Sequence, residues 1–222
     1  ASGDRLQTSL FWRCSPGAWL GVDLFFVVSG FLITNILLSA RGRPRRFRNF
    51  WIRRALRIFP LAYLYLVTLI VIGLFWQRFA VMRHPSPIAW ISTYLINYRL
   101  AWKGWHLAEV SILWSLAVEE QFYTGWPLLA LKLPLRWLGR LLVAALIVTP
   151  LVRWEVAGRL GSIAAYVLTV TRWDALAAGA LLALAWRSPA RAALLVWSKR
   201  LILPSMVVIA VVLGVPFGPE NA

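Results

Sequence analysis

The feature that most limits what this chain can fold into is a series of apolar stretches, most of them about as long as a membrane crossing. They lie near residues 18–39, 58–77, 108–131, 138–152, 173–186 and 201–217, with a further one at 88–98. A helix of roughly 20 apolar residues crosses the hydrocarbon core, because it satisfies every backbone N–H and C=O internally. The sequence therefore predicts an all-α, polytopic helical membrane protein with about six transmembrane helices.

Composition supports this fold class and its domain organisation. The chain of 222 residues is 60% hydrophobic, which is too apolar for a soluble domain of that length. Residues 1–17 are too polar to span and are expected to form a non-spanning, truncated N-terminal segment. Residues 18–217 are expected to form one incomplete transmembrane domain in contact with the lipid bilayer.

Basic residues are concentrated in three of the predicted connections. The net charge of +16 would point to nucleic acid in a soluble protein, but here eight arginines lie within residues 41–57, and further Lys and Arg residues lie within 132–140 and 187–200. If these connections are cytoplasmic, the positive-inside rule agrees with the alternation of crossings, provided that 88–98 does not cross fully. We expect no nucleic-acid partner. The 41–57 segment would either hold the anionic leaflet or also bind an anionic ligand.

Several common types of catalytic site are missing from the sequence. Cys14 is the single cysteine, and His84 and His106 are far from any other potential metal ligand in the sequence. The chain contains neither a phosphate-binding GxxxxGK[ST] loop nor a GxSxG motif. We therefore predict no metal site and no permanently bound cofactor.

Acidic side chains in apolar stretches are the main functional candidates, because ionisable groups inside a membrane tend to face a protein interior or a water-filled cavity. Ser115, Glu119 and Tyr123 follow at helical spacing, so they share one stripe, whereas Glu120 and Gln121 point elsewhere. A desolvated Glu119 would suit a general acid or base, and a nearby arginine would make it an electrostatic or positioning group. Alternatively, the stripe is an interhelical hydrogen-bond seam.

The remaining acids have simpler interpretations. Asp23 lies near one end of its apolar stretch, which favours a water-exposed helix start. Asp174 favours an N-terminal acid stabilised by the helix dipole. It precedes a stripe of small residues that permits close helix packing: Ala175, Gly179 and Ala183. Ser29 and Gly30 are typical of a packing notch.

Four segments occur together in a characteristic order. They read GVDLFFVVSGFLIT at 21–34, RRALRIFPLAY at 53–63, WSLAVEEQFYTGWPLL at 114–129 and TRWDALAAGALLA at 171–183. In this order they resemble the membrane-bound acyltransferase family 3, a group of bacterial O-acyltransferases that modify surface glycans. The resemblance extends from about residue 18 to about residue 186. The WSLxxExxFY element is highly specific when it follows GVDxFFxxSGF.

The resemblance implies a multi-pass enzyme of the bacterial inner membrane. Such an enzyme moves an acyl group, usually acetyl from acetyl-CoA or another acyl-CoA as donor substrate, to a hydroxyl of a surface or exported carbohydrate. It implies that Glu119 is catalytic and that Arg53, Arg54 and Arg57 bind the phosphates of coenzyme A. Further motif positions are expected to shape or position this site: Asp23, Ser29, Gly30, Trp114, Ser115, Phe122, Tyr123, Arg172 and Asp174.

The chain also departs from the family pattern. Members begin with an additional helix that carries an arginine and a histidine assigned as the catalytic base. Residues 1–17 contain no such span and no histidine. We therefore expect a fragment that lacks the first and last membrane helices, and an inactive fragment is one alternative function class. A polytopic transporter whose buried acids relay protons is another, although the sequence contains no internal symmetry of the kind many transporters have.

Overall fold

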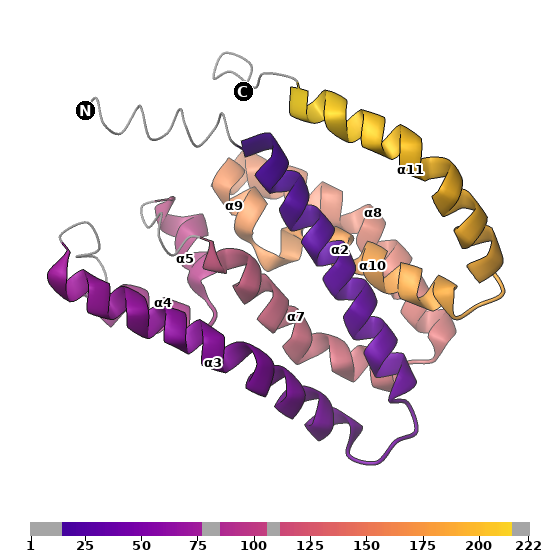
Figure 1. The fold of residues 1–222 in the computed structure, drawn as a ribbon, viewed down its shortest axis with the longest axis horizontal. Helices are drawn as coiled ribbons and strands as arrows, with labels where there is room; N and C mark the ends of the chain where they lie inside the picture. The colour runs from indigo at the N-terminus through magenta and orange to yellow at the C-terminus, as the bar shows by residue number, and fades with distance from the viewer. Residues whose placement is uncertain (1–14, 77–84, 106–111, 215–222) are drawn as a thin grey trace.

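The computed structural model describes residues 15–76, 85–105 and 112–214, and every regular element within them is a helix (Figure 1). The prediction of an all-α fold is confirmed for this part of the chain. The elements in chain order are α2 (Ser15–Ser39), α3 (Arg46–Phe75), α4 (Pro85–Ser92), α5 (Ile96–Lys103), α7 (Leu113–Lys132), α8 (Leu135–Leu160), α9 (Ser162–Val167), the 3-10 helix η2 (Thr169–Thr171), α10 (Trp173–Trp186) and α11 (Arg191–Gly214).

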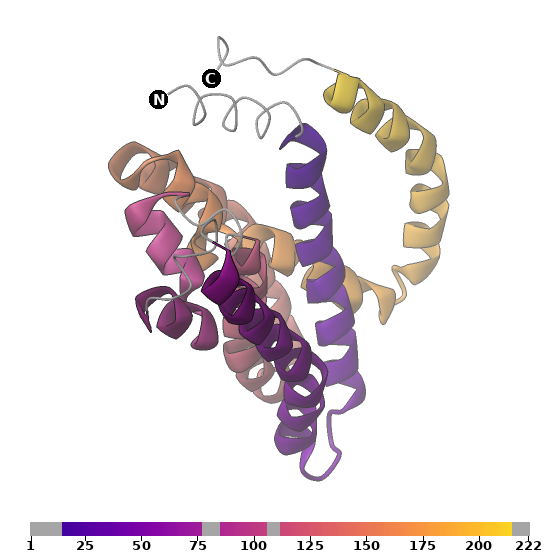
Figure 2. The ribbon, with the colours of Figure 1, turned by 60° about the vertical axis from the view of Figure 1, so that its left-hand side comes forward.

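Helix α2 lies at the centre of the bundle. It packs against α10 and α7, and α10 also packs against α8. Helix α3 diverges from α2 beyond their connection, and α11 lies on the outer side of α2 (Figures 1 and 2). The short elements α5, α9 and η2 pack against one another at the other end of the bundle. This arrangement leaves α2, α3 and α7 around the site described below.

The α2–α3, α7–α8 and α10–α11 connections, which contain or adjoin the three basic segments, lie at the same end of the bundle, toward the lower right of Figure 1. Arg41, in the α2–α3 connection, donates hydrogen bonds to the carbonyl oxygens of Ala130 and Leu133 at the end of α7. Arg187, which follows α10, donates to the carbonyl oxygen of Asn35 near the end of α2. The successive long helices run in alternating directions (Figure 1), as alternating membrane crossings require.

Three helices of the described residues are long and apolar enough to cross a membrane: Leu20–Ser39, Arg46–Phe75 and Leu135–Leu160. They make this a membrane protein. Helix α10 has 14 residues, and α7 carries two carboxylates within its length. The number of about six crossings therefore stays a prediction. The stretch at 88–98 is divided between two helices of 8 residues each, so it does not cross as one helix.

The expected boundaries of three helices were wrong. Helix α11 begins at Arg191 and not near residue 201, so Arg191, Lys199 and Arg200 lie in this helix rather than in a connection. Helix α3 begins at Arg46, so most of the basic segment 41–57 is helical rather than a connection. Arginine is a good helix former, and its long side chain reaches the polar membrane interface from a helix, so the charges do not end the helix. Helix α8 extends over Leu135–Leu160, beyond the predicted 138–152, with Pro150 inside it. Membrane helices tolerate such prolines where neighbouring groups satisfy the backbone.

Two glycines allow α2 and α10 to approach closely. A Cβ atom at Gly30 would overlap the backbone carbonyl of Leu176, and one at Gly179 would overlap that of Val27. The predicted packing stripe on α10 and the packing notch at Gly30 are therefore confirmed. Because both obstacles are backbone atoms, the helices would have to move apart to accept a side chain at either position.

We expect Gly179→Ala to destabilise the protein, because the overlap forces the α2–α10 pair apart at a cost of about 1–3 kcal/mol. A matched control is Gly125→Ala, since Gly125 is helical and exposed and a Cβ there meets nothing. The control should unfold at the same temperature as the parent or slightly higher, because alanine favours a helix. Thermal unfolding in detergent micelles measures both, and equal midpoints for the two variants would contradict the close approach.

Candidate active site

A carboxylate and two hydroxyls from two helices meet between α7 and α2. Tyr123 Oη donates a hydrogen bond to Glu119 Oε1 at 2.6 Å, and Ser29 Oγ of α2 donates to the same oxygen. The two hydroxyl oxygens lie 2.5 Å apart. All three side chains are buried. We call Glu119, Tyr123 and Ser29 the Glu119 cluster.

The predicted stripe of Ser115, Glu119 and Tyr123 was wrong at one position, Ser115. Ser115 does not continue the stripe, because its hydroxyl donates instead to the carbonyl oxygen of Ile112 at 3.3 Å. A serine hydroxyl commonly makes such local bonds to its own helix. Ser29, which the sequence alone favoured as part of a packing notch, supplies the second hydroxyl from α2.

The Glu119 cluster lies on the wall of a cavity of about 750 Å³ between α2, α3 and α7. Most of the lining is apolar, and among the described lining residues Glu119 is the only carboxylate. Arg54 and Arg57 of α3 also line this cavity. The guanidinium carbon of Arg54 lies 4.9 Å from the centre of the Tyr123 ring. A positive charge therefore lies beside the buried carboxylate, which compensates part of its burial cost.

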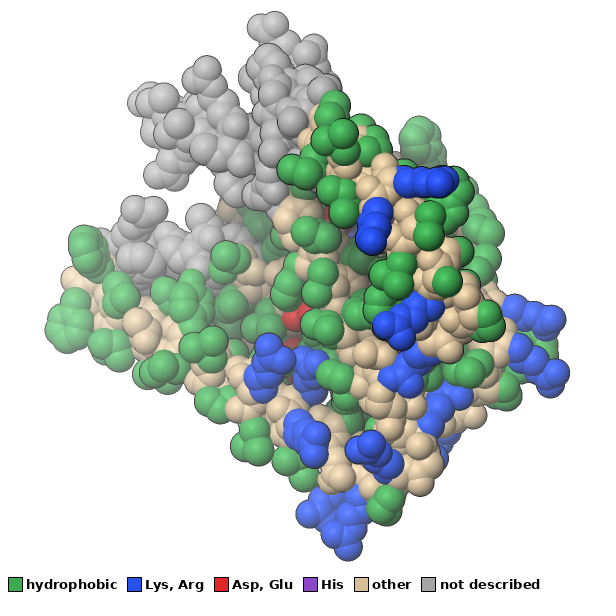
Figure 3. Space-filling model, turned by 45° about the vertical axis from the view of Figure 1, so that its right-hand side comes forward, with side chains coloured by type: hydrophobic (Ala, Val, Ile, Leu, Met, Phe, Trp, Pro, Cys, Tyr) green, Lys and Arg blue, Asp and Glu red, His purple; other side chains and the backbone are tan. Residues whose placement is uncertain are grey.

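A second, smaller pocket of about 280 Å³ lies at the basic end, where α2 connects to α3. Its basic lining residues are Arg43, Arg46, Arg53, Arg54 and Arg57. Arg54 and Arg57 also line the large cavity, so the two spaces share one wall, whereas Arg53 lines the small pocket only. Figure 3 shows Lys and Arg side chains gathered mostly toward this end of the molecule. We call this space the basic pocket.

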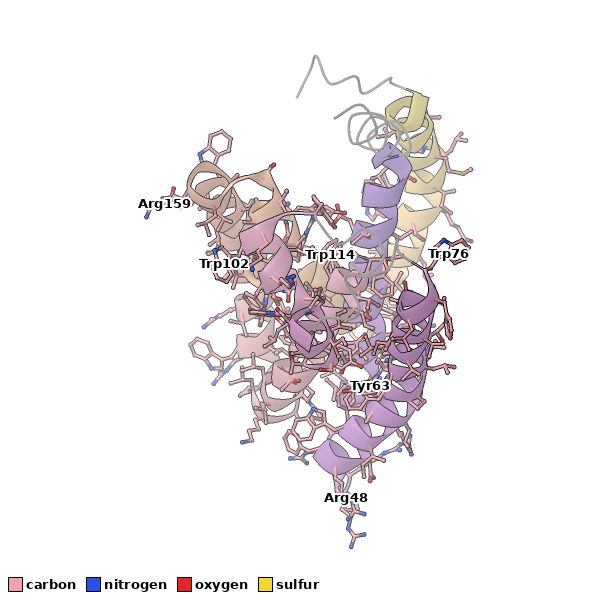
Figure 4. The ribbon with its side chains drawn as sticks, turned by 90° about the vertical axis from the view of Figure 1, so that its left-hand side faces the viewer. Arg48, Tyr63, Trp76, Trp102, Trp114 and Arg159 are labelled. Atoms are coloured by element: carbon pink, nitrogen blue, oxygen red, sulfur yellow. The ribbon has the colours of Figure 1, made fainter. Side chains whose placement is uncertain are left out.

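The buried Arg172 forms a second polar centre with the half-exposed Asp23. Its Nη1 donates to Asp23 Oδ1 at 2.9 Å, and its Nε donates to the carbonyl oxygen of Tyr166 at 2.6 Å. The guanidinium also lies over the rings of Tyr166 and Trp114, at 4.1 and 5.7 Å from their centres. Trp114 lies inside the bundle beside α2 (Figure 4). Asp23 lies within α2, so the predicted helix start was wrong.

Two further motif residues hold α10 in place. Asp174 is in the first turn of α10, as predicted, and its Oδ2 accepts a hydrogen bond from Arg153 Nη2 at 2.5 Å. The Phe122 ring stacks on Trp126 and meets Trp173 edge-on. Neither Phe122 nor Asp174 lines the large cavity. Their position indicates a packing role between α7, α8 and α10.

A buried amide network on the opposite side of α7 was not predicted from the sequence. Gln121 Nε2 donates to Asn97 Oδ1 at 3.0 Å, and Asn97 Nδ2 donates to Thr169 Oγ1 at 3.0 Å. The network joins α7 to α5 and η2. Gln121 and Asn97 lie in apolar stretches of the sequence, and a buried amide must find hydrogen-bond partners, so these two residues could have indicated the network. Among the described residues, no group of three or more His, Cys, Asp or Glu side chains is placed to hold a metal ion.

We expect Arg172→Gln to destabilise the protein more than Asp23→Asn. Arg172 is 5% exposed and would lose charged hydrogen bonds and two ring contacts, which is worth about 2 kcal/mol or more. The Asp23 side chain is 51% exposed, and water and the asparagine oxygen can still accept from Arg172, so its loss should cost less. Thermal unfolding midpoints of the two variants test this order, and the reverse order would contradict it.

The chain was also compared with known proteins. The acyltransferase domain family matches residues 7–222. YrhL of Bacillus subtilis, which is named provisionally as a peptidoglycan O-acetyltransferase, is 37% identical over 124 residues, or 50% of this chain and 19% of its own length. The peptidoglycan O-acetyltransferase OatA of Listeria monocytogenes is 33% identical over 135 residues, or 55% and 21%.

A third relative covers more of the chain. The O-acetyltransferase OatA of Staphylococcus aureus is 31% identical over 186 residues, which are 77% of this chain and 30% of the relative. The chain thus spans less than a third of the length of these relatives. No solved structure matches it significantly.

Proposed function

The chain belongs to the acyltransferase domain family, and from this premise we propose that the protein transfers an acetyl group to a hydroxyl of a cell-surface carbohydrate. The names of two relatives give peptidoglycan, a carbohydrate-containing polymer, as their substrate. Because the chain spans less than a third of those relatives, the activity and acceptor of the whole protein are part of the proposal.

The observation that carries the proposal is the Glu119 cluster on the wall of a large, mostly apolar cavity. In the transfer, the acceptor hydroxyl oxygen bonds to the acyl carbonyl carbon, the bond from that carbon to the donor breaks, and the hydroxyl proton must leave. A carboxylate within hydrogen-bond reach can accept such a proton. The family resemblance assigns that step to a histidine of a preceding helix, and Glu119 would then orient this histidine.

We propose acyl-CoA as the donor substrate. Its phosphates would bind in the basic pocket, where arginines provide forked donors for phosphate oxygens. Its acyl end would extend past Arg54 and Arg57 into the large cavity toward Glu119, since these two arginines line both spaces. This geometry also gives the basic segment a role beyond holding the anionic leaflet.

We further propose that the protein is a multi-pass protein of the bacterial inner membrane, with its basic end in the cytoplasm. The connections that contain or adjoin the three basic segments lie at that end, and positive charge favours the cytoplasmic side. Acyl-CoA is a cytoplasmic metabolite, so the donor would enter at the basic pocket. The acceptor carbohydrate would approach from the opposite end of the cavity.

Membranes that contain the full-length protein test the proposal directly. With acetyl-labelled acetyl-CoA and purified peptidoglycan, we expect label on the glycan that is released by mild alkaline hydrolysis of the ester. Transfer from a different acetyl donor alone would remove acyl-CoA from the proposal and leave the transfer reaction in place. No transfer from any donor, together with proton flux in vesicles, would favour a transporter instead.

A further inference from the structure

A third hollow, of about 590 Å³, lies at the basic end of the bundle, between the ends of α2 and α10 and the start of α8. It shares no lining residue with the large cavity or the basic pocket. Its lining combines three arginines with four leucines: Arg41, Arg136, Arg187, Leu38, Leu135, Leu181 and Leu184. We call it the arginine–leucine hollow. Nothing in the proposed acyl transfer uses it.

Two of the three arginines are fixed by backbone groups at helix ends. Arg41 Nε donates to the Ala130 carbonyl oxygen at 2.9 Å, and its Nη2 donates to that of Leu133 at 2.8 Å. Arg187 Nη2 donates to the Asn35 carbonyl oxygen at 3.0 Å, and its Nε donates to the Asn35 side-chain oxygen at 2.7 Å. A guanidinium has five N–H donors, so these bonds orient each group and leave further donors available. Such pre-positioned arginines lose little conformational freedom on binding an anion.

The positive charge of the hollow has no carboxylate counterpart in the described part of the chain. The described ion pairs join Arg153 to Asp174, Arg159 to Glu155 and Arg172 to Asp23, and none includes an arginine of the hollow. Three guanidinium groups around one space therefore favour an anionic ligand, and arginine forms bidentate hydrogen bonds with phosphate.

The leucines of the hollow favour a lipid over a small free anion as its ligand. Leu38 lies in the last turn of α2, Leu135 is the first residue of α8, and Leu181 and Leu184 lie in the last two turns of α10. Leu135 is exposed beside Arg136, at the start of a helix that is long and apolar enough to cross the membrane. A small phosphate would use the arginines but leave the exposed Leu135 and the half-buried Leu181 and Leu184 uncovered. A phospholipid would cover both, since its headgroup and acyl chains meet at this depth.

We propose that the arginine–leucine hollow binds an anionic phospholipid, with its phosphate at Arg41, Arg136 and Arg187 and its acyl chains along the leucines. Arginine-rich pockets between membrane helices on the cytoplasmic side are suited to anionic headgroups. A lipid there would link α2, α8 and α10 and so stabilise the basic end of the bundle. The inference stands whether or not the chain transfers acyl groups.

The test compares Arg136→Gln with Arg140→Gln in the full-length protein. Both arginines are exposed on the first turns of α8 and both changes remove one charge, but only Arg136 lines the hollow. Arg140 instead lies over the Trp137 ring, at 4.7 Å. Arg41 and Arg187 are left unchanged because they cap helix ends. The protein is reconstituted in phosphatidylcholine bilayers with and without phosphatidylglycerol, and retained lipids are counted by native mass spectrometry.

The parent protein and Arg140→Gln should retain phosphatidylglycerol in preference to phosphatidylcholine. Arg136→Gln should reduce that retention about fivefold, the effect of one arginine at a lipid headgroup. Equal loss in both variants, or equal retention of the two lipids by the parent, would overturn the proposal. Displacement of the lipid by glycerol phosphate at similar concentrations would assign the site to a small anion and would also overturn it.

Discussion

Glu119→Gln is expected to lower acetyl transfer by at least about 100-fold, because the carboxylate is needed whether it accepts the hydroxyl proton itself or orients the histidine that accepts it. Glutamine keeps the size of the side chain and an oxygen at the position of Oε1, so the Ser29 and Tyr123 hydroxyls can still donate to it. The change removes the negative charge and the ability to accept a proton. The protein should therefore fold and insert as before, and only the reaction should be lost.

The measurement is the rate of labelled acetyl transfer in membranes, normalised to the amount of inserted protein. Glu120→Gln is the matched control, because Glu120 is the next residue of α7 and does not line the large cavity. Its activity should stay within a few-fold of the parent. Full activity of Glu119→Gln would remove Glu119 from the mechanism, and an equal loss in both variants would point to damage to α7 rather than to a site.

Replacing Arg53 and Arg57 together with glutamine is expected to raise the KM for acyl-CoA by about 10- to 100-fold. Each lost hydrogen bond between charged groups contributes about 1.5–3 kcal/mol, so this range is a conservative expectation for two. Both residues line the basic pocket. Arg54 is left in place because it lies over the Tyr123 ring, where a change would also disturb the Glu119 cluster.

Arg48→Gln provides the control for loss of charge alone. Arg48 projects from the end of α3 away from the bundle (Figure 4), and it does not line the basic pocket. It should leave the KM unchanged, and the double variant should keep most of its kcat. If Arg48→Gln raises the KM by as much per lost charge as the Arg53 and Arg57 double variant does, the net positive charge of this end, and not the basic pocket, attracts the donor. An unchanged KM in the double variant would remove the basic pocket as the donor site.

Part of the candidate site followed from periodicity within one helix. Glu119 and Tyr123 are one turn apart, so their common face could be predicted from sequence, and the structure confirms it. The same spacing predicted Ser115 on this face, but Ser115 instead bonds to its own helix. Spacing shows which residues share a face, but it does not show which of them face a neighbouring helix. The neighbour decides that, and α2 crosses α7 at Glu119 and Tyr123.

Ser29 and Asp23 show what spacing within one segment cannot supply. Each meets a partner far along the chain, Glu119 for Ser29 and Arg172 for Asp23. The register between helices sets these pairs, and that register depends on close backbone approaches such as Gly30 against α10. For this reason the sequence favoured local roles for both residues, a packing notch and a helix start, and missed their long-range partners.

The sequence by itself determined that this is a helical membrane protein of the acyltransferase family with a buried acid on one helix face. Hydropathy, charge placement and helical period are local properties, and a lipid environment permits few backbone solutions. The tertiary structure alone decided that Ser29 completes the Glu119 cluster and that Arg54 and Arg57 join the two cavities. It also decided that Arg41, Arg136 and Arg187 surround one hollow. These features depend on how separate helices pack, because each combines side chains that are distant in sequence and converge only once the bundle has formed.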